Sequence, residues 1–209
     1  MTSKMIKARA RKAGLPPGAL VPSAERTTEK ISVTVFDYNA EKLVEHHNAS
    51  LQKCLQALQS SAVTWINICG IDDIQTIELV GRRFGLHPLL LEDIMNSGQR
   101  SKLDDYKDNL YVVVKMLTYH EEKQLVEDEQ VSLVLGNNFL ISFLESKNNI
   151  FASIYDRLRP QNSRIRQKGA DYLCYTLIDC LVDNYFLILE KVDGKLERLE
   201  GTLEGLDEA

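Results

Sequence analysis

The stretch that decides the fold is GLHPLLLEDIMNSGQRSKLDD, residues Gly85–Asp105. Pro88 is typical of the first turn of a helix, where a residue without a backbone N–H loses no hydrogen bond. The apolar residues after it predict a short buried helix that ends at the Asn-Ser-Gly run of 96–98. Glu92 and Asp93 lie inside this apolar helix, where carboxylates need a charged partner, a capping role or a cation.

Two interpretations of this acidic pair are open from the residues alone. The pair can be the solvated flank of an amphipathic helix. It can also belong to a site for a hard cation, because Mg2+ and Ca2+ bind oxygen ligands and often carboxylates. Neighbouring helical side chains point about 100° apart, so Glu92 and Asp93 are not expected to chelate one ion by themselves. A second element or a second subunit would have to complete the ligand shell.

The patterns on either side of this helix predict a sheet with helices on its faces. Apolar alternation and β-branched runs predict the strands, and Gly136-Asn137-Asn138 predicts a hairpin turn. The run at 110–119 is so apolar that we place it centrally. We therefore predict an α/β fold over 31–165, a mixed β-sheet sandwiched between helices (α/β/α). The predicted strands are 31–37, 63–68, 110–119, 131–135 and 139–144, and the predicted helices are 40–60, 72–84 and the helix that begins at Pro88.

Composition, residue spacing and missing motifs argue against several classes of protein. The 209 residues suffice for one large domain, or a domain plus an extension, and the net charge of -5 argues against nucleic acid as the main partner. The four cysteines and four histidines show no metal-ligand spacing, which predicts reduced, buried thiols in a cytoplasmic protein. No phosphate loop or activated nucleophile accompanies the acids, so we expect no enzyme. We also expect no membrane span, for want of about twenty consecutive apolar residues, and no secretion signal.

The two ends of the chain differ from the middle. Residues 1–30 carry a basic cluster and are predicted to be partly disordered, either as a plain charged tail or as a contact to anionic lipid. Residues 168–209 predict one long coiled-coil-like helix. Its predicted a and d positions are Tyr175, Ile178, Val182, Tyr185, Leu189, Val192, Leu196, Leu199, Leu203 and Leu206.

The predicted helix is too long to bury this seam on a domain of this size. It extends for more than about 45 Å at 1.5 Å per residue. In the first half, Leu181, Phe186 and Ile188 widen the apolar stripe, which predicts packing on the domain. In the second half only a narrow seam flanked by acids remains. That seam requires a partner helix, which we expect beyond Ala209.

Several motifs of this chain together resemble the cytoplasmic N-terminal domain of CorA-type magnesium transport proteins. The HPLxLEDI and DYLxYxLID patterns, at this order and distance, carry the resemblance. It extends from the GLPPG stretch (Gly14–Gly18) to the last residues. The motifs are WINICGI (Trp65–Ile71), FGLHPLLLEDIMNSGQRSKLDDY (Phe84–Tyr106), EQVSLVLGNNFLISFLE (Glu129–Glu145) and ADYLCYTLIDCLVDNYFLILEKVD (Ala170–Asp193).

The resemblance implies a set of metal ligands. Glu92, Asp93 and Asp179 match acidic residues that line regulatory divalent-cation sites between neighbouring subunits of a pentamer, and the backbone carbonyl of Leu15 matches a further ligand. On spacing alone, Asp179 is better explained as a solvated acid beside the seam, and the resemblance reverses that interpretation. Where family members can carry a histidine after the LEDI motif, this chain has Gly98. A further aspartate of the family comes from the next helix, which this chain lacks.

The resemblance also implies a function. Such a domain senses Mg2+ on the cytoplasmic side of the cell membrane and holds a homopentameric pore shut, and Co2+ is a second possible ion. The pore helix and the membrane region, with a Gly-Met-Asn signature, are expected downstream of Ala209. Two alternatives stay open, namely the same domain of a related Zn2+ transporter and a coiled-coil interaction module without metal sensing. The transported ion (Mg2+, Co2+, Ni2+ or Zn2+) and the oligomeric state of these 209 residues alone also stay open.

Overall fold

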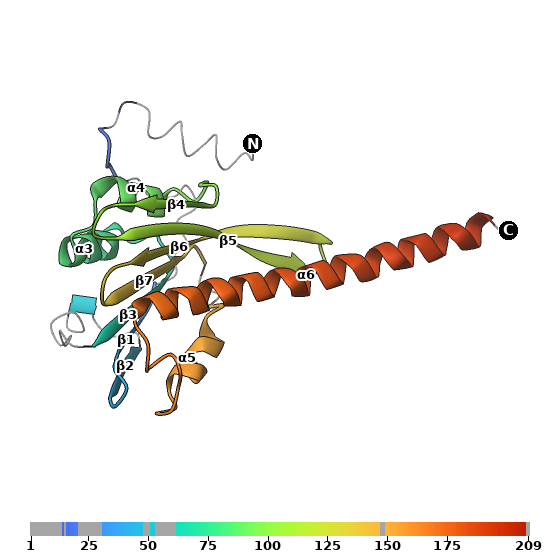
Figure 1. Cartoon of the computed structure of the whole chain (residues 1–209). Helices are drawn as coiled ribbons and strands as arrows, with labels where there is room; N and C mark the ends of the chain where they lie inside the picture. Colours follow the sequence, from blue (N-terminus) through green and yellow to red (C-terminus); the bar gives the residue numbers. More distant parts are fainter. Residues whose placement is uncertain are drawn as a thin grey trace.

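The computed structural model describes residues 14, 16–20, 31–47, 51–52, 62–146 and 149–207, with backbone only for 203–207. A seven-stranded sheet has helices on both faces, and a long helix continues past it (Figure 1). The predicted α/β architecture is therefore confirmed. The elements are β1 (Ser32–Tyr38), β2 (Leu43–His47), β3 (Val63–Cys69), α3 (Ile74–Phe84), α4 (Pro88–Met95), β4 (Lys102–Asp105), β5 (Leu110–His120), β6 (Leu125–Leu135), β7 (Phe139–Leu144), α5 (Ala152–Leu158) and α6 (Ala170–Asp207).

The sheet has the strand order β2-β1-β3-β7-β6-β5-β4. Its central pair, β3 and β7, is parallel, with Thr64 opposite Phe139, and the other pairs are antiparallel. The predicted hairpin is confirmed, because the Gly136 N–H donates to the Phe139 carbonyl at 2.9 Å between β6 and β7. The sheet is therefore mixed, as predicted.

The helix predicted over 40–60 is wrong in its first part, where β2 pairs with β1. The reason is a turn at Asn39, whose side-chain oxygen accepts the N–H groups of Glu41 at 2.9 Å and Lys42 at 2.8 Å. Such an Asn turn reverses the chain and starts a hairpin, which overrides the helical pattern that follows. Leu51 and Gln52 are helical, whereas 48–50 and 53–60 lie outside the described residues.

The neighbours of β5 differ from the prediction of a central strand. Only Leu110–Val113 pair with the short edge strand β4, which falls in the predicted polar link. Farther along β5, side chains of α6 contact the strand in place of β4. Asn184 donates its side-chain N–H to the Leu117 carbonyl at 2.6 Å, and the Tyr185 hydroxyl donates to the Lys115 carbonyl. Helix side chains thus satisfy backbone groups on the part of β5 that extends past β4.

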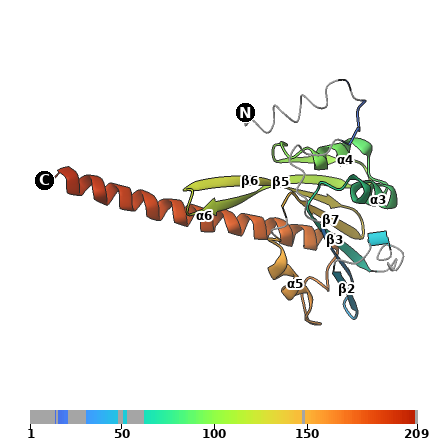
Figure 2. The ribbon, with the colours of Figure 1, turned by 180° about the vertical axis from the view of Figure 1, so that it is seen from behind.

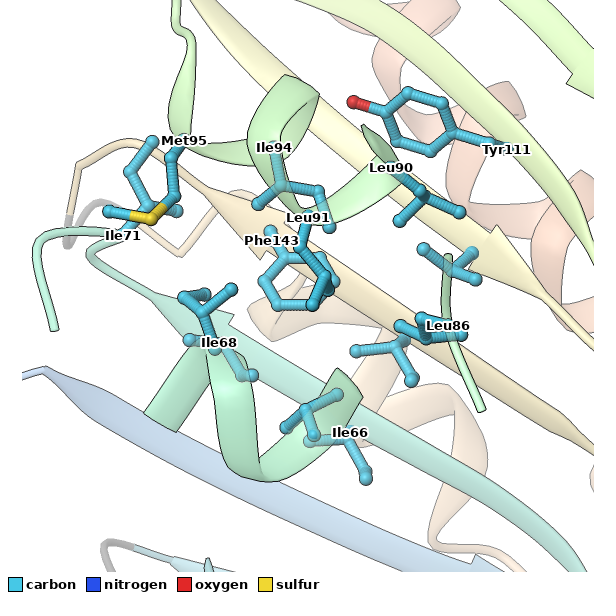
Figure 3. Close-up of a cluster of buried hydrophobic side chains, with 14 of the residues drawn as sticks. Ile66, Ile68, Ile71, Leu86, Leu90, Leu91, Ile94, Met95, Tyr111 and Phe143 are labelled. Carbon is cyan, nitrogen blue, oxygen red and sulfur yellow. The ribbon is translucent and has the colours of Figure 1, made fainter. Parts of the chain in front are cut away.

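One apolar core lies on each face of the sheet. Figure 3 shows the first core, where Leu90, Leu91 and Ile94 of α4 pack against Ile66 and other sheet residues. The second core joins α5 and α6 to the alternate side chains of the same strands, because successive residues of a strand face opposite sides. α4 and α6 therefore lie on opposite faces of the sheet (Figure 1).

Trp65 and Asp73 each make a side-chain hydrogen bond that anchors an element of the fold. Trp65 is a core residue, fully buried in the second core, where its Nε1–H donates to the Ser142 hydroxyl at 3.0 Å. Asp73 caps α3, since its side chain accepts the Gln75 N–H at 3.1 Å.

The long helix is confirmed, but it packs on the sheet mainly through residues beside the predicted seam, while Ile178 and Tyr185 of the seam are half-buried against the sheet. Its buried residues are Ala170, Leu173, Cys174, Thr176, Leu177, Leu181 and Ile188. Along the seam, Tyr175, Val182, Leu189, Leu196 and Leu199 are exposed. Phe186 is exposed as well, so the prediction that it packs on the domain is wrong, whereas it is right for Leu181 and Ile188. Figure 2 shows α6 running beside the β5–β6 hairpin and past its tip. The partner helix for the seam stays a prediction.

The stretch Ala170–Thr202 of α6 is long and apolar enough to cross a membrane, by length and composition alone. Asp179 and Asp183 interrupt the stretch, so it is not a run of about twenty consecutive apolar residues, and the expectation of no membrane span stays a prediction. In this structure Leu173, Leu177 and Leu181 of the same stretch are buried against the sheet. A core helix of a soluble domain passes the same test, so the stretch is weak support for a membrane span.

Candidate functional site

The first predicted ligand, Glu92, holds the docked Gly-Pro-rich loop. α4 begins at Pro88, and the ring of His87 caps it by accepting the Leu89 N–H at 3.2 Å. The Gly18 N–H donates to a carboxylate oxygen of Glu92 at 2.7 Å. Gly18 has a φ of +84°, and a Cβ there would lie 2.9 Å from the Cβ of Pro88, so the close approach requires glycine.

This contact brings the described part of the loop onto α4. Glu92 is half-buried and carries a backbone hydrogen bond. Leu15, whose backbone carbonyl is the fourth predicted ligand, lies outside the described residues. Its role in metal binding stays a prediction.

The second predicted ligand, Asp93, has contacts on each of its oxygens. Its side chain accepts the Gln99 side-chain N–H at 2.9 Å on one oxygen and contacts the Lys102 ammonium at 2.7 Å on the other. Its backbone carbonyl accepts a side-chain N–H of Gln130 at 3.1 Å. The Gln130 side-chain oxygen in turn accepts the Gln99 N–H at 3.2 Å. Asp93 is thus held by the link after α4, by β4 and by β6.

Lys102 joins Asp93 to a second carboxylate. Its ammonium also lies 2.7 Å from an oxygen of Asp104 and sits over the ring of Tyr111 at 5.4 Å from the centroid. Partial burial by itself lowers the pKa of Lys102, but the hydrogen bonds with Asp104 and Asp93 outweigh it and raise the pKa above its usual range. A positive charge therefore already lies between two carboxylates here. Such a donor set fits a cation.

The third predicted ligand, Asp179, lies away from the other two. It is exposed on α6, on the opposite face of the sheet from α4. Within the described part of the chain, no group of three or more His, Cys, Asp and Glu side chains could hold a metal ion. One chain thus does not bring Asp179 to Glu92 and Asp93, and a site with all three acids requires two chains.

Reasoning from the sequence missed the residues that surround the Asp93 side chain, namely Lys102, Asp104, Gln99 and Gln130. A signal for two of them was present, because Lys102 and Asp104 are two residues apart and share one face if the segment is a strand. The segment is polar, and we therefore predicted a link instead of a strand. Gly98, which directly precedes Gln99, is half-buried.

Of the described cysteines, Cys69 and Cys174 are buried as predicted, whereas Cys180 is half-buried. Cys69, Cys174 and Cys180 are free. Burial raises the pKa of Cys69 and of Cys174 to about 11, which keeps both thiols protonated and unreactive near neutral pH. Cys54 lies outside the described residues.

Comparison with known proteins gives matches of two kinds. In sequence, the chain is similar to the cobalt/magnesium transport protein CorA of Thermotoga maritima, 41% identical over 189 residues that cover 90% of this chain and 54% of that protein. In structure, it is similar to the soluble domain of CorA from Methanocaldococcus jannaschii, with a TM-score of 0.63, 15% identity, and coverage of 86% of this chain and 66% of that chain. It is also similar to the cytoplasmic domain of ZntB from Vibrio parahaemolyticus, with a TM-score of 0.61, 12% identity, and coverage of 81% and 65%.

At these low identities the two structures show a shared fold. The chain spans about half the length of the curated relative it matches. Residues 60–209 match the family described as CorA-like Mg2+ transporter protein, which is more than half of the chain. The chain therefore belongs to the CorA-like Mg2+ transporter family.

Proposed function

We propose that this chain is the cytoplasmic, divalent-cation-sensing domain of a pentameric CorA-type Mg2+ transporter, in which Mg2+ bound between subunits favours the closed pore. Membership of the family supports a role in ion transport and not in catalysis. The observation that carries the proposal is the separation of the three acids. Glu92 and Asp93 lie on one face of the sheet and Asp179 lies on the other.

This separation suits a ring of identical subunits. Each chain offers the acidic pair Glu92 and Asp93 on its α4 face, and Asp179 among the exposed acids of α6. In a head-to-tail arrangement the α4 face of one subunit meets the α6 face of the next, and such an interface closes into a ring when the rotation fits. Every interface then gathers Glu92 and Asp93 from one subunit and Asp179 from its neighbour. Carboxylate oxygens of this kind suit Mg2+, and also Co2+ less specifically.

Regulation follows from charge. Without a cation, carboxylates of neighbouring subunits repel each other across the interface. A cation shared between them binds the closed arrangement better than the open one, and only this difference in affinity moves the equilibrium. We expect binding in the millimolar range, since Mg2+ gives up its water reluctantly. The contacts of Asp93 with Gln99 and Lys102 also compete with Mg2+ for the carboxylate of Asp93.

One observation favours a second function. The exposed members of the α6 seam suit helix pairing without any metal, and they are Tyr175, Val182, Leu189, Val192, Leu196 and Leu199. In that case the chain is an interaction module, and divalent ions change neither its assembly nor its stability. The related possibility of a Zn2+ transporter predicts that Zn2+ replaces Mg2+ as the effective ion, and the shared fold of the ZntB domain is its support.

The test uses the full-length transporter to which this chain belongs. Asp93→Ala combined with Asp179→Ala removes one acid from each side of the proposed interface, and we expect inhibition of uptake by Mg2+ to need about tenfold more Mg2+, equal to about 1.4 kcal/mol. Asp183→Ala is the matched control, because Asp183 is exposed one turn farther along α6 and carries the same charge. If the double variant keeps the wild-type sensitivity, the proposal is wrong.

A further inference from the structure

The Lys102 ammonium is the positive charge nearest to the proposed ligand Asp93 in the described structure. It lies 2.7 Å from a carboxylate oxygen of Asp93, so it holds a position that a bound cation would need. The two side chains are about a quarter exposed, at 28% for Lys102 and 25% for Asp93. Water therefore screens this pair less than it screens an ordinary surface pair. A cation that binds Asp93 has to weaken this contact first.

Asp104 gives the displaced ammonium a place to stay. Lys102 and Asp104 lie on one face of β4, and Nζ is 2.7 Å from an oxygen of Asp104 as well. The ammonium can thus leave Asp93 without losing every partner. The ring of Tyr111 lies below it and also favours a cation at this position. The two carboxylates and the ring together define two neighbouring positions for one ammonium group.

We infer that Lys102 is a built-in counter-ion that competes with the divalent cation for Asp93, with Asp104 as the anchor that keeps the ammonium after displacement. This inference rests on the proposed function, because it assigns Lys102 the role of setting the Mg2+ threshold of that site. Lys102 is a positioning residue and does not bind the ion.

The competition also separates divalent from monovalent cations. A monovalent ion brings no more charge to Asp93 than the ammonium that it displaces, so it gains little from the exchange. A divalent ion brings twice the charge, and its attraction to the carboxylates is correspondingly larger. Lys102 therefore raises the Mg2+ concentration at which the site fills and makes the site insensitive to the far more abundant monovalent ions.

The experiment measures the thermal midpoint of the purified full-length transporter across a MgCl2 series at constant ionic strength. Lys102→Met removes the competing charge, and we expect half-maximal stabilisation at about tenfold lower Mg2+, which corresponds to about 1.4 kcal/mol. Asp104→Asn leaves the ammonium with Asp93 alone and should raise the Mg2+ midpoint about threefold. Lys102→Arg keeps the charge and should stay within about twofold of the wild type.

Two controls match the charge changes. Lys107→Met removes a lysine from the exposed turn after β4, and Asp105→Asn removes an acid from the opposite side of the strand. Both should leave the Mg2+ midpoint unchanged. Equal midpoints in the wild type, Lys102→Met and Asp104→Asn would overturn the role of Lys102 but leave the proposed function intact. If Mg2+ stabilises neither the wild type nor any variant, the proposed function fails, and the inference fails with it.

Discussion

Replacing Leu181 by alanine tests which face of α6 packs on the sheet. Leu181 is fully buried in the second core, whereas Leu189, a predicted seam position, is 61% exposed. Leu181→Ala removes three buried carbon groups at about 0.8 kcal/mol each and leaves a cavity, so the free energy of unfolding should fall by about 3 kcal/mol. Leu189→Ala should change it by less than about 0.5 kcal/mol. Helix propensity differs little between leucine and alanine, and it affects both variants equally.

The assay is urea unfolding of the chain followed by the fluorescence of Trp65. Trp65 is the single tryptophan of the sequence and lies fully buried in the same core as Leu181. The unfolding midpoint of Leu181→Ala should fall while the slope stays unchanged. In a thermal scan the same loss corresponds to about 6–12 °C for a chain of this size.

The comparison between the two leucines decides the result. A larger loss for Leu189→Ala than for Leu181→Ala would mean that the seam, and not the face observed here, packs on the sheet. Equal small losses would mean that α6 is not docked on the domain at all. Either result would refute the described packing of the helix.

Two further predictions concern contacts that do not involve the proposed metal ligands. Tyr185→Phe removes the hydroxyl that donates to the Lys115 carbonyl and should lower the free energy of unfolding by about 1 kcal/mol, whereas Tyr175→Phe, at an exposed position, should not change it in the same urea assay. The hydrogen bonds of Arg159 lower the pKa of Glu45 from its usual value near 4.5, so the stabilisation is present at neutral pH and is lost as the pH falls through the lowered pKa. Arg159→Gln should therefore reduce the melting temperature more at about pH 7 than at about pH 3, and an equal reduction at both would contradict the ion pair.

Patterns with a local cause were predictable from the sequence. The hairpin at Gly136, the cap at Asp73 and the start of α4 at Pro88 depend on neighbouring residues, and the structure has each of them. β2 was missed because its position depends on the turn at Asn39 and on pairing with β1. The helical spacing of the apolar residues led us to predict a helix there instead. β4 was missed because a polar edge strand has the composition of a link.

The candidate site was predictable only in part. Glu92 and Asp93 were found because carboxylates are unusual in an apolar helix. The partners of Asp93 were not, because Lys102 meets it through the packing of β4 beside α4, and no spacing in the sequence encodes that contact. In α6, the buried positions and the seam have the same helical period, so the sequence could not tell which stripe meets the sheet.

The parallel pairing of β3 with β7 has a consequence during synthesis. The whole stretch from 70 to 138 separates the two strands, and a ribosome needs roughly 4–14 s to make it at 5–20 residues per second. Until β7 is made, β3 can pair with β1 on one side, whereas its other edge lacks the strand that covers it in the finished sheet. The centre of the finished sheet is therefore an edge strand in the nascent chain. Protection by a chaperone matters most in the interval before β7 emerges.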